Sequence, residues 1–81
     1  MSKIIFCKIL LQVPESEIFY LSTIVDSYDN LGYIRKEEAP IGHTWLFFSN
    51  DMKDEVYELL LLLQDEIEGL KIKGEPIAVE V

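Results

Sequence analysis

The sequence predicts a single α+β domain, residues 1–81, with the element order β-α-β-β-α-β. Two segments have helical periodicity, residues 15–29 and 52–68. Four segments have the alternating or continuous apolar pattern of strands, residues 4–13, 33–38, 44–48 and 70–81. This order is typical of the split βαβ, ferredoxin-like sandwich, in which an antiparallel four-stranded sheet carries two helices on one face.

The first predicted strand is residues 4–13, where apolar residues recur with period two. Its odd-numbered residues from Ile5 to Val13 are all apolar, whereas the even-numbered ones include Lys8 and Gln12. A strand exposes alternate side chains on opposite faces, so the odd-numbered face is expected in the core. Pro14 ends the strand and opens a helix, because proline suits a first helical turn.

The first predicted helix follows, at residues 15–29. Its apolar residues fall within about 120° of one another, as expected for an amphipathic helix, and they are Ile18, Leu21, Ile24, Val25 and Tyr28. Asn30 or Gly32 is expected to end the helix in the left-handed conformation. A short, charged strand from Tyr33 to Glu38 comes next, and a turn at residues 39–43 leads to the apolar strand at residues 44–48.

The second predicted helix ends near Glu68, and its N-cap is expected among residues 49–51. Gly69 closes it. Its apolar residues share one direction and predict the side that packs on the sheet: Met52, Val56, Leu59, Leu60, Leu63 and Ile67.

The charges predict the order of the strands. Residues 4–13 and 44–48 are the most apolar, whereas residues 33–38 and 70–81 carry charged residues and Pro76. Charges and proline suit edge strands, since they prevent pairing with other sheets. The first and third strands are therefore expected in the centre of the sheet, as the split βαβ topology requires.

The sequence contains more large apolar residues than one core accounts for. Burying each is worth about 1.5–3 kcal/mol, so an exposed group of them favours an interaction surface. The candidate interface residues are Ile4, Phe6, Leu10, Trp45 and Phe47 on the sheet, and Phe19, Leu61 and Leu62 on the helices. We expect a homodimer or a protein partner. The alternative is that the last strand, or its C-terminal residues 77–81, folds over and covers part of this surface.

The sequence offers little for catalysis or metal binding. One cysteine, Cys7, and one histidine, His43, cannot supply the ligands of a zinc site. Cys7 is expected in the core and His43 in an exposed turn, so a dyad would require the fold to bring them together. We therefore expect no catalytic residue, no metal and no cofactor.

The charge of the chain predicts which partners it avoids. A net charge of −8 opposes binding to the phosphate backbone of nucleic acids, so no nucleic-acid partner is expected. All bases except Lys53 fall in predicted strands or, for Lys3, directly before one, whereas most acids fall in or beside the helices. No apolar segment is long enough to span a membrane, and a lone cysteine without a secretory pattern predicts the cytoplasm.

Residues 18–35 resemble a short bacterial family called domain of unknown function 4911. The resemblance lies in the pair Tyr20-Leu21, in Tyr28-Asp29-Asn30-Leu31-Gly32 at the helix end and in the basic strand that follows. It extends over about residues 3–70 and implies the fold without an activity. The leading interpretation is therefore a non-enzymatic domain that self-associates or binds a protein.

A weaker similarity to ACT-type regulatory domains implies a second role, the sensing of a small-molecule ligand at a subunit interface. These domains usually carry an Asp-x-x-Gly turn after the first strand, where this chain has Val13-Pro14-Glu15-Ser16 without a glycine. The candidate ligand site of this alternative is Pro14, Glu15, Ser16, Asn30 and Gly32.

Overall fold

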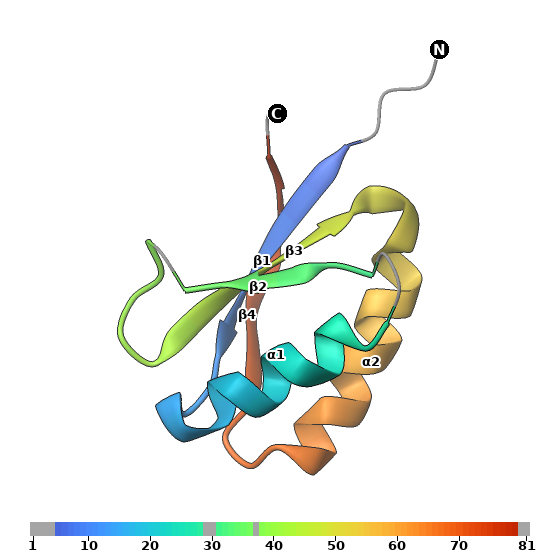
Figure 1. The fold of residues 1–81 in the computed structure, drawn as a ribbon. Coiled ribbons are helices and arrows are strands. Elements are labelled where there is room, and N and C mark those ends of the chain that lie inside the picture. The colour runs from blue at the N-terminus through green and yellow to red at the C-terminus, as the bar shows by residue number, and fades with distance from the viewer. Residues whose placement is uncertain (1–4, 29–30, 37, 80–81) are drawn as a thin grey trace.

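A computed structural model describes residues 5–28, 31–36 and 38–79 of the chain. Figure 1 shows an antiparallel sheet with both helices on one side of it. The elements are β1 (Phe6–Gln12), a 3-10 turn (Glu15–Glu17), α1 (Ile18–Asp26), β2 (Tyr33–Arg35), β3 (His43–Ser49), a second 3-10 turn (Asn50–Met52), α2 (Lys53–Glu66) and β4 (Lys71–Val79). The predicted α+β class and the order β-α-β-β-α-β are confirmed.

The strand order in the sheet is β2-β3-β1-β4, and all neighbouring strands are antiparallel. The apolar strands β1 and β3 therefore occupy the centre, and the charged strands β2 and β4 form the edges, as predicted. Pro76 lies on edge strand β4, where a register shift between Lys8 and Leu10 of β1 interrupts the pairing. An edge with an irregularity is where a strand tolerates a residue without a backbone N–H.

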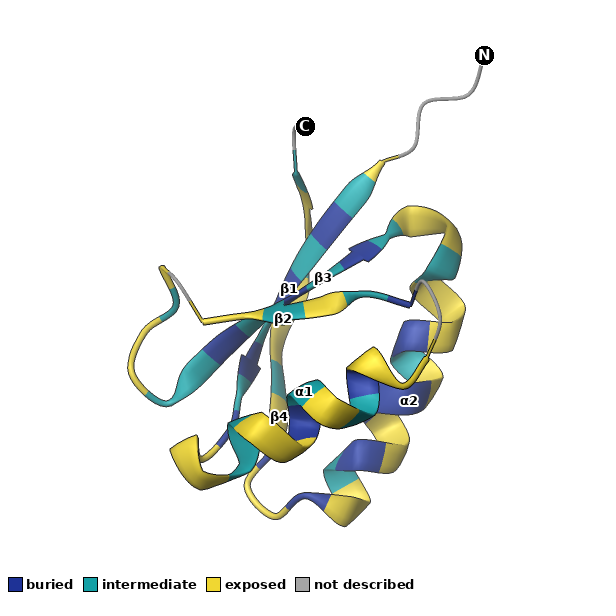
Figure 2. Cartoon of the chain, in the orientation of Figure 1, coloured by how far each residue is buried: buried dark blue, intermediate teal, exposed yellow. Residues whose placement is uncertain are grey.

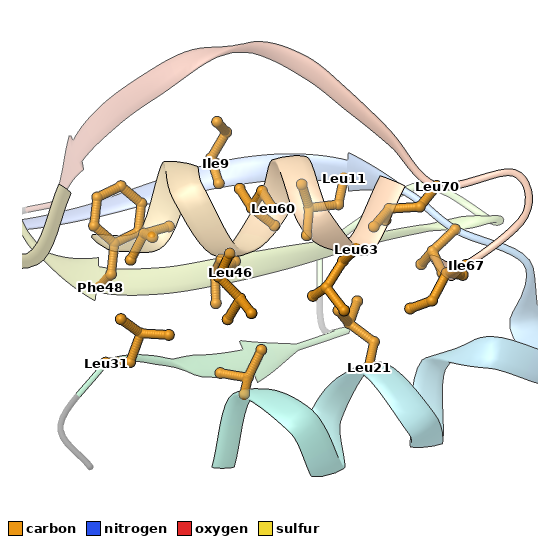
Figure 3. Close-up of a cluster of buried hydrophobic side chains, with 14 of the residues drawn as sticks. Ile9, Leu11, Leu21, Leu31, Leu46, Phe48, Leu60, Leu63, Ile67 and Leu70 are labelled. Carbon is orange, nitrogen blue, oxygen red and sulfur yellow. The ribbon is translucent and has the colours of Figure 1, made fainter. Parts of the chain in front are cut away.

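The hydrophobic core lies between the helices and one face of the sheet. In β1 the residues Cys7, Ile9 and Leu11 are buried, and the residues between them are half-buried, which Figure 2 shows as alternating dark blue and teal bands. The predicted residues of the second helical segment are buried, except Met52, which is only partly buried; Met52 and Ile67 flank α2 and the others lie within it. Figure 3 labels ten of the buried side chains: Ile9, Leu11, Leu21, Leu31, Leu46, Phe48, Leu60, Leu63, Ile67 and Leu70.

The first helix is shorter than predicted, because α1 ends at Asp26 and its first turn is a separate 3-10 turn. Tyr28, which was expected on the buried side, is 48% exposed. Leu31 is buried in the core after the helix has ended. The chain thus fills the end of the core with a loop residue, and Tyr28 is left near the surface. In the second helical segment Ser49 is the predicted N-cap, and its Oγ accepts a hydrogen bond from the Asp51 N–H.

Gly32 does not take the left-handed conformation that was predicted for it, and Asn30 lies outside the described residues. Its role is close packing instead. A Cβ at this position would lie 2.3 Å from the backbone oxygen of Phe47 in β3 and 3.2 Å from the Phe48 Cβ. Gly69 does have a positive φ, of 89°, three residues after α2 ends, as expected of a helix-terminating glycine.

The described end of the chain does not fold over the sheet. Ile77 and Val79 remain in β4, where they pair with Lys8 and Phe6 of β1. The alternative in which this segment covers the surplus apolar surface is therefore wrong for residues 77–79. Within the described residues, no helix is long and apolar enough to cross a membrane.

Gly32→Ala should lower the free energy of unfolding by about 1–3 kcal/mol, since the added methyl group meets a backbone carbonyl that cannot move away without disturbing β3. Urea denaturation measures this loss. Gly42→Asn is the control, because Gly42 has a φ of 80° with open space around it and asparagine tolerates this conformation. An unchanged stability in Gly32→Ala would show that the close approach to Phe47 is wrong.

Candidate binding surface on the open face of the sheet

The face of the sheet that the helices do not cover is formed by the side chains between the core residues; we call it the open face. In β1 and β3 these side chains alternate with buried ones and are all half-buried. The pairing of the strands fixes which residues are neighbours on it. Phe47 lies between Lys8 and Tyr33, and Trp45 lies between Leu10 and Arg35.

The edge strand β4 extends the open face with basic and apolar side chains. Lys73 pairs with Leu10, and Lys71 pairs with Gln12. Ile77, which is 51% exposed, pairs with Lys8. Aromatic and apolar side chains thus lie in the middle of the face, and lysines and an arginine lie among and beside them.

The aromatic rings of the open face interact with each other and with its cations. The rings of Tyr33 and Phe47 are stacked, with centroids 5.2 Å apart and an angle of 4° between their planes. The Lys8 Nζ lies 4.4 Å from the centroid of the Trp45 ring, and the Arg35 guanidinium carbon lies 5.6 Å from that of Tyr33. Both cations are within the range in which the π-face of a ring attracts positive charge.

Two donors at the centre of the open face lack an acceptor. No carboxylate among the described residues forms a salt bridge with Lys8, whose recorded interaction is with the Trp45 ring. The Trp45 Nε1 is buried and has no hydrogen-bond partner in the described structure. A buried donor without an acceptor costs about 1–3 kcal/mol, so the centre of the face is incompletely satisfied within one chain.

Acidic side chains are absent from the described part of the open face. Glu75 is the acid of β4, and it lines a hollow of about 390 Å³ on the side of the helices, together with Cys7 and Tyr57. Desolvation, followed by the negative charge of Glu75, raises the pKa of the Tyr57 phenol. Because Cys7 belongs to the core side of β1 and Tyr57 to α2, Glu75 points away from the open face.

The solvent side of α2 has the opposite charge. With 3.6 residues per turn, the buried residues Val56, Leu60 and Leu63 lie opposite a set of exposed residues in which acidic side chains flank an apolar pair. This set is Asp54, Glu58, Leu61, Leu62 and Asp65, which we call the outer face of α2. Leu61 is 60% exposed and Leu62 66%.

Most of the predicted interface residues therefore fall on two separate surfaces, the open face and the outer face of α2. Phe6, Leu10, Trp45 and Phe47 belong to the open face and are half-buried by their neighbours. Leu61 and Leu62 belong to the outer face of α2, and Phe19 is 84% exposed on α1. Ile4 lies outside the described residues.

Sequence reasoning missed part of the open face, namely Tyr33, Arg35, Lys71, Lys73 and Ile77; it placed Lys8 on the face of Phe6 and Leu10 but did not count it among the interface residues. The one signal for them was that the bases gather in the predicted strands. Which bases share a face with Trp45 depends on the register between strands, and this register depends on long-range pairing.

The residues of the predicted ligand site do not all lie together. Pro14 lies against Gly69, because a Cβ added at Gly69 would be 3.1 Å from the Pro14 Cγ. Gly32 instead lies against Phe47 and Phe48. These contacts belong to opposite ends of α1. Glu15 forms an ion pair with Lys36 beyond β2. Ser16 is exposed in the 3-10 turn, and Asn30 is not described.

Cys7 and His43 do not form a dyad. Cys7 pairs with Phe48 at one end of β1, whereas His43 pairs with Gln12 at the other. The Cys7 Sγ is buried and donates to the Asn50 Oδ1 over 3.9 Å, and the His43 Nδ1 lies 3.1 Å from the Ile41 carbonyl oxygen. Among the described residues, no group of three or more His, Cys, Asp or Glu side chains could hold a metal ion.

The fold and this surface define a ferredoxin-like α+β domain with one uncovered sheet face. The model of the family described as Domain of unknown function (DUF4911) matches residues 11–67, and the chain belongs to this family. The resemblance noted in residues 18–35 is thereby confirmed. Comparison with curated proteins and with solved structures gave no match.

Glu66→Gln should lower the pKa of Tyr20. The Tyr20 hydroxyl donates to the Glu66 Oε1 over 2.6 Å and joins α1 to α2; this bond, together with desolvation and the charge of Glu66, raises the pKa of the phenol. The raised pKa favours the folded state below pH ~10, and this contribution is lost as the pH rises through the pKa of the folded form.

NMR titration of the Tyr20 ring measures the change, with Glu58→Gln as the control for the loss of a distant charge on the same helix. An equal titration of Tyr20 in wild type and Glu66→Gln would contradict the contact.

Proposed function

We propose that this protein is a non-enzymatic, cytoplasmic interaction domain whose open face binds an acidic and partly apolar protein surface. The observation that supports this most strongly is Lys8 lying over the Trp45 ring. This cation sits at the centre of the face, and the described chain gives it no carboxylate. A partner that supplies a carboxylate there, with apolar side chains around it, completes the surface.

The composition of the face is suited to binding a protein. Tryptophan, tyrosine and arginine are enriched among the residues that dominate binding energies at protein interfaces, and the face carries Trp45, Tyr33 and Arg35. The stacked rings of Tyr33 and Phe47 offer a large apolar area at low cost in side-chain entropy.

Lys8 determines the kind of partner. Burying an ammonium group against an apolar surface is costly unless an opposite charge meets it. The cations of the open face therefore favour acidic partners and disfavour purely apolar ones. Few carboxylates are needed, which suits a protein surface better than a nucleic acid, because a nucleic acid presents a phosphate at every nucleotide and takes its affinity from many cations.

A second proposal, ACT-like sensing of a small molecule, has less support. Its residues Pro14 and Gly32 belong to opposite ends of α1, and the Glu15 carboxylate is engaged by Lys36. A thermal-shift screen of amino acids and nucleotides tests it, since a ligand at 100 times its dissociation constant adds about 2.7 kcal/mol to stability.

Poly-glutamate should perturb the fluorescence of Trp45, the single tryptophan of the chain, because its carboxylates bind around Lys8. The change should saturate, weaken with salt and be absent with poly-lysine. Lys8→Gln should weaken the binding, and Lys53→Gln should not, since Lys53 is an exposed base of α2.

Two outcomes would overturn the proposal. One is a Trp45 signal that poly-glutamate leaves unchanged. The other is a signal that responds to single-stranded oligodeoxythymidine more strongly than to poly-glutamate, which would identify the open face as a base-stacking surface.

A further inference from the structure

We infer that the acidic surface bound by the open face is the outer face of α2 of a second copy of this chain, so that the protein associates head-to-tail. This inference rests on the proposed function and names its partner. It follows from the chemistry of the two uncovered surfaces, which lie on opposite sides of one molecule.

The outer face of α2 has the pattern that the open face requires. Leu61 and Leu62 are exposed side by side, and Glu58 and Asp65 lie one turn before and after them on the same side of the helix. Asp54 continues the acidic series toward the start of α2. In the head-to-tail contact, the apolar pair of α2 with its flanking carboxylates thus meets the aromatic rings of the open face with their flanking cations.

The dimensions of the two surfaces agree. α2 has 14 residues and is about 21 Å long. β1, the strand along the centre of the open face, has seven residues and is about 23 Å long. The helix of one copy can therefore lie over the sheet of another with Leu61 and Leu62 near Trp45 and with carboxylates near Lys8 and Lys73.

Charge argues against the two symmetric arrangements. An open face packed on a second open face brings Lys8, Arg35 and Lys73 toward their own copies. Two outer faces of α2 packed together bring Glu58 and Asp65 of one copy toward the same acidic residues of the other copy. Like charges placed opposite each other weaken an interface, whereas the head-to-tail contact brings the carboxylates of α2 toward the cations of the open face.

A head-to-tail contact has a consequence that a symmetric dimer lacks. In a head-to-tail pair, one copy keeps an unused open face and the other keeps an unused outer face of α2, so association continues beyond two copies until a ring closes. The mean mass in solution should therefore rise with concentration past that of a dimer, and it should fall as salt screens the charges.

Two charge-reversed variants test the inference by light scattering and sedimentation velocity. The sheet variant carries Lys71→Glu and Lys73→Glu on exposed positions of β4, and the helix variant carries Glu58→Lys and Asp65→Lys on exposed positions of α2. Circular dichroism and thermal unfolding verify that both fold. Each variant alone should associate at least about tenfold more weakly than wild type, because like charges now face each other.

Mixing the two variants should restore association, because the reversed sheet then meets the reversed helix and the unaltered faces meet each other. The control variant, Asp26→Lys with Glu68→Lys, changes two exposed charges outside the outer face of α2 and should associate like wild type.

Three results would overturn the inference: a wild type that stays monomeric at high concentration and low salt, a helix variant that associates like wild type, or two variants that do not associate when mixed. Binding of poly-glutamate by a wild type that stays monomeric would remove this inference and leave the proposed function standing. If the wild type stays monomeric and also fails to bind poly-glutamate, the proposed function is wrong as well.

Discussion

The structure depends on one constraint: a sheet has two faces, and this chain has two helices that cover one of them. β1 and β3 carry large apolar side chains on both faces, so the helices bury Ile9 and Leu46 while Leu10 and Trp45 remain on the other side. The chain reduces the exposure of this second face by packing its own side chains, as in the stack of Tyr33 on Phe47. The face is half-buried in consequence, and it keeps both apolar area and charge.

The charges are separated by the same constraint. The strands carry Lys8, Arg35, Lys71 and Lys73 toward the open face, and the helices carry most of the carboxylates away from it. A net charge of −8 therefore describes the molecule poorly at short range. Within about 10 Å, roughly one Debye length in dilute salt, a partner of the open face meets a basic surface. The acidic protein partner that we propose matches this local charge.

Much of the fold could be predicted from the sequence because its signals are local. The alternation in β1 and the apolar side of α2 each require only the period of one element, and both were predicted at the right residues, except that Ile5 is 50% exposed and Met52 is only partly buried. The end of α1 was not, because Tyr28 and Leu31 both suit the edge of a core and the choice between them depends on how the loop packs. Gly32 was misjudged for a similar reason, since the carbonyl that excludes a side chain there belongs to Phe47, far along the chain.

For the candidate surface too, the residues set by local patterns could be predicted and those set by long-range pairing could not. Phe6, Leu10, Trp45 and Phe47 could be assigned to one face from alternation within a strand. The contact of Lys8 with Trp45 requires the register of β1 against β3, and the position of Lys73 beside Leu10 requires the irregularity in β4. Neither register is specified by a local pattern, so the sequence revealed the apolar part of the surface more readily than its cations.

The most direct test of the central claim is a dilution series followed by the backbone and indole N–H signals in NMR. The account predicts that two groups of signals shift with concentration: those of the open face, with the Trp45 indole N–H among them, and those of the outer face of α2 around Leu61 and Leu62. Signals that stay unchanged over the whole series, or that shift on one of the two surfaces alone, would contradict it.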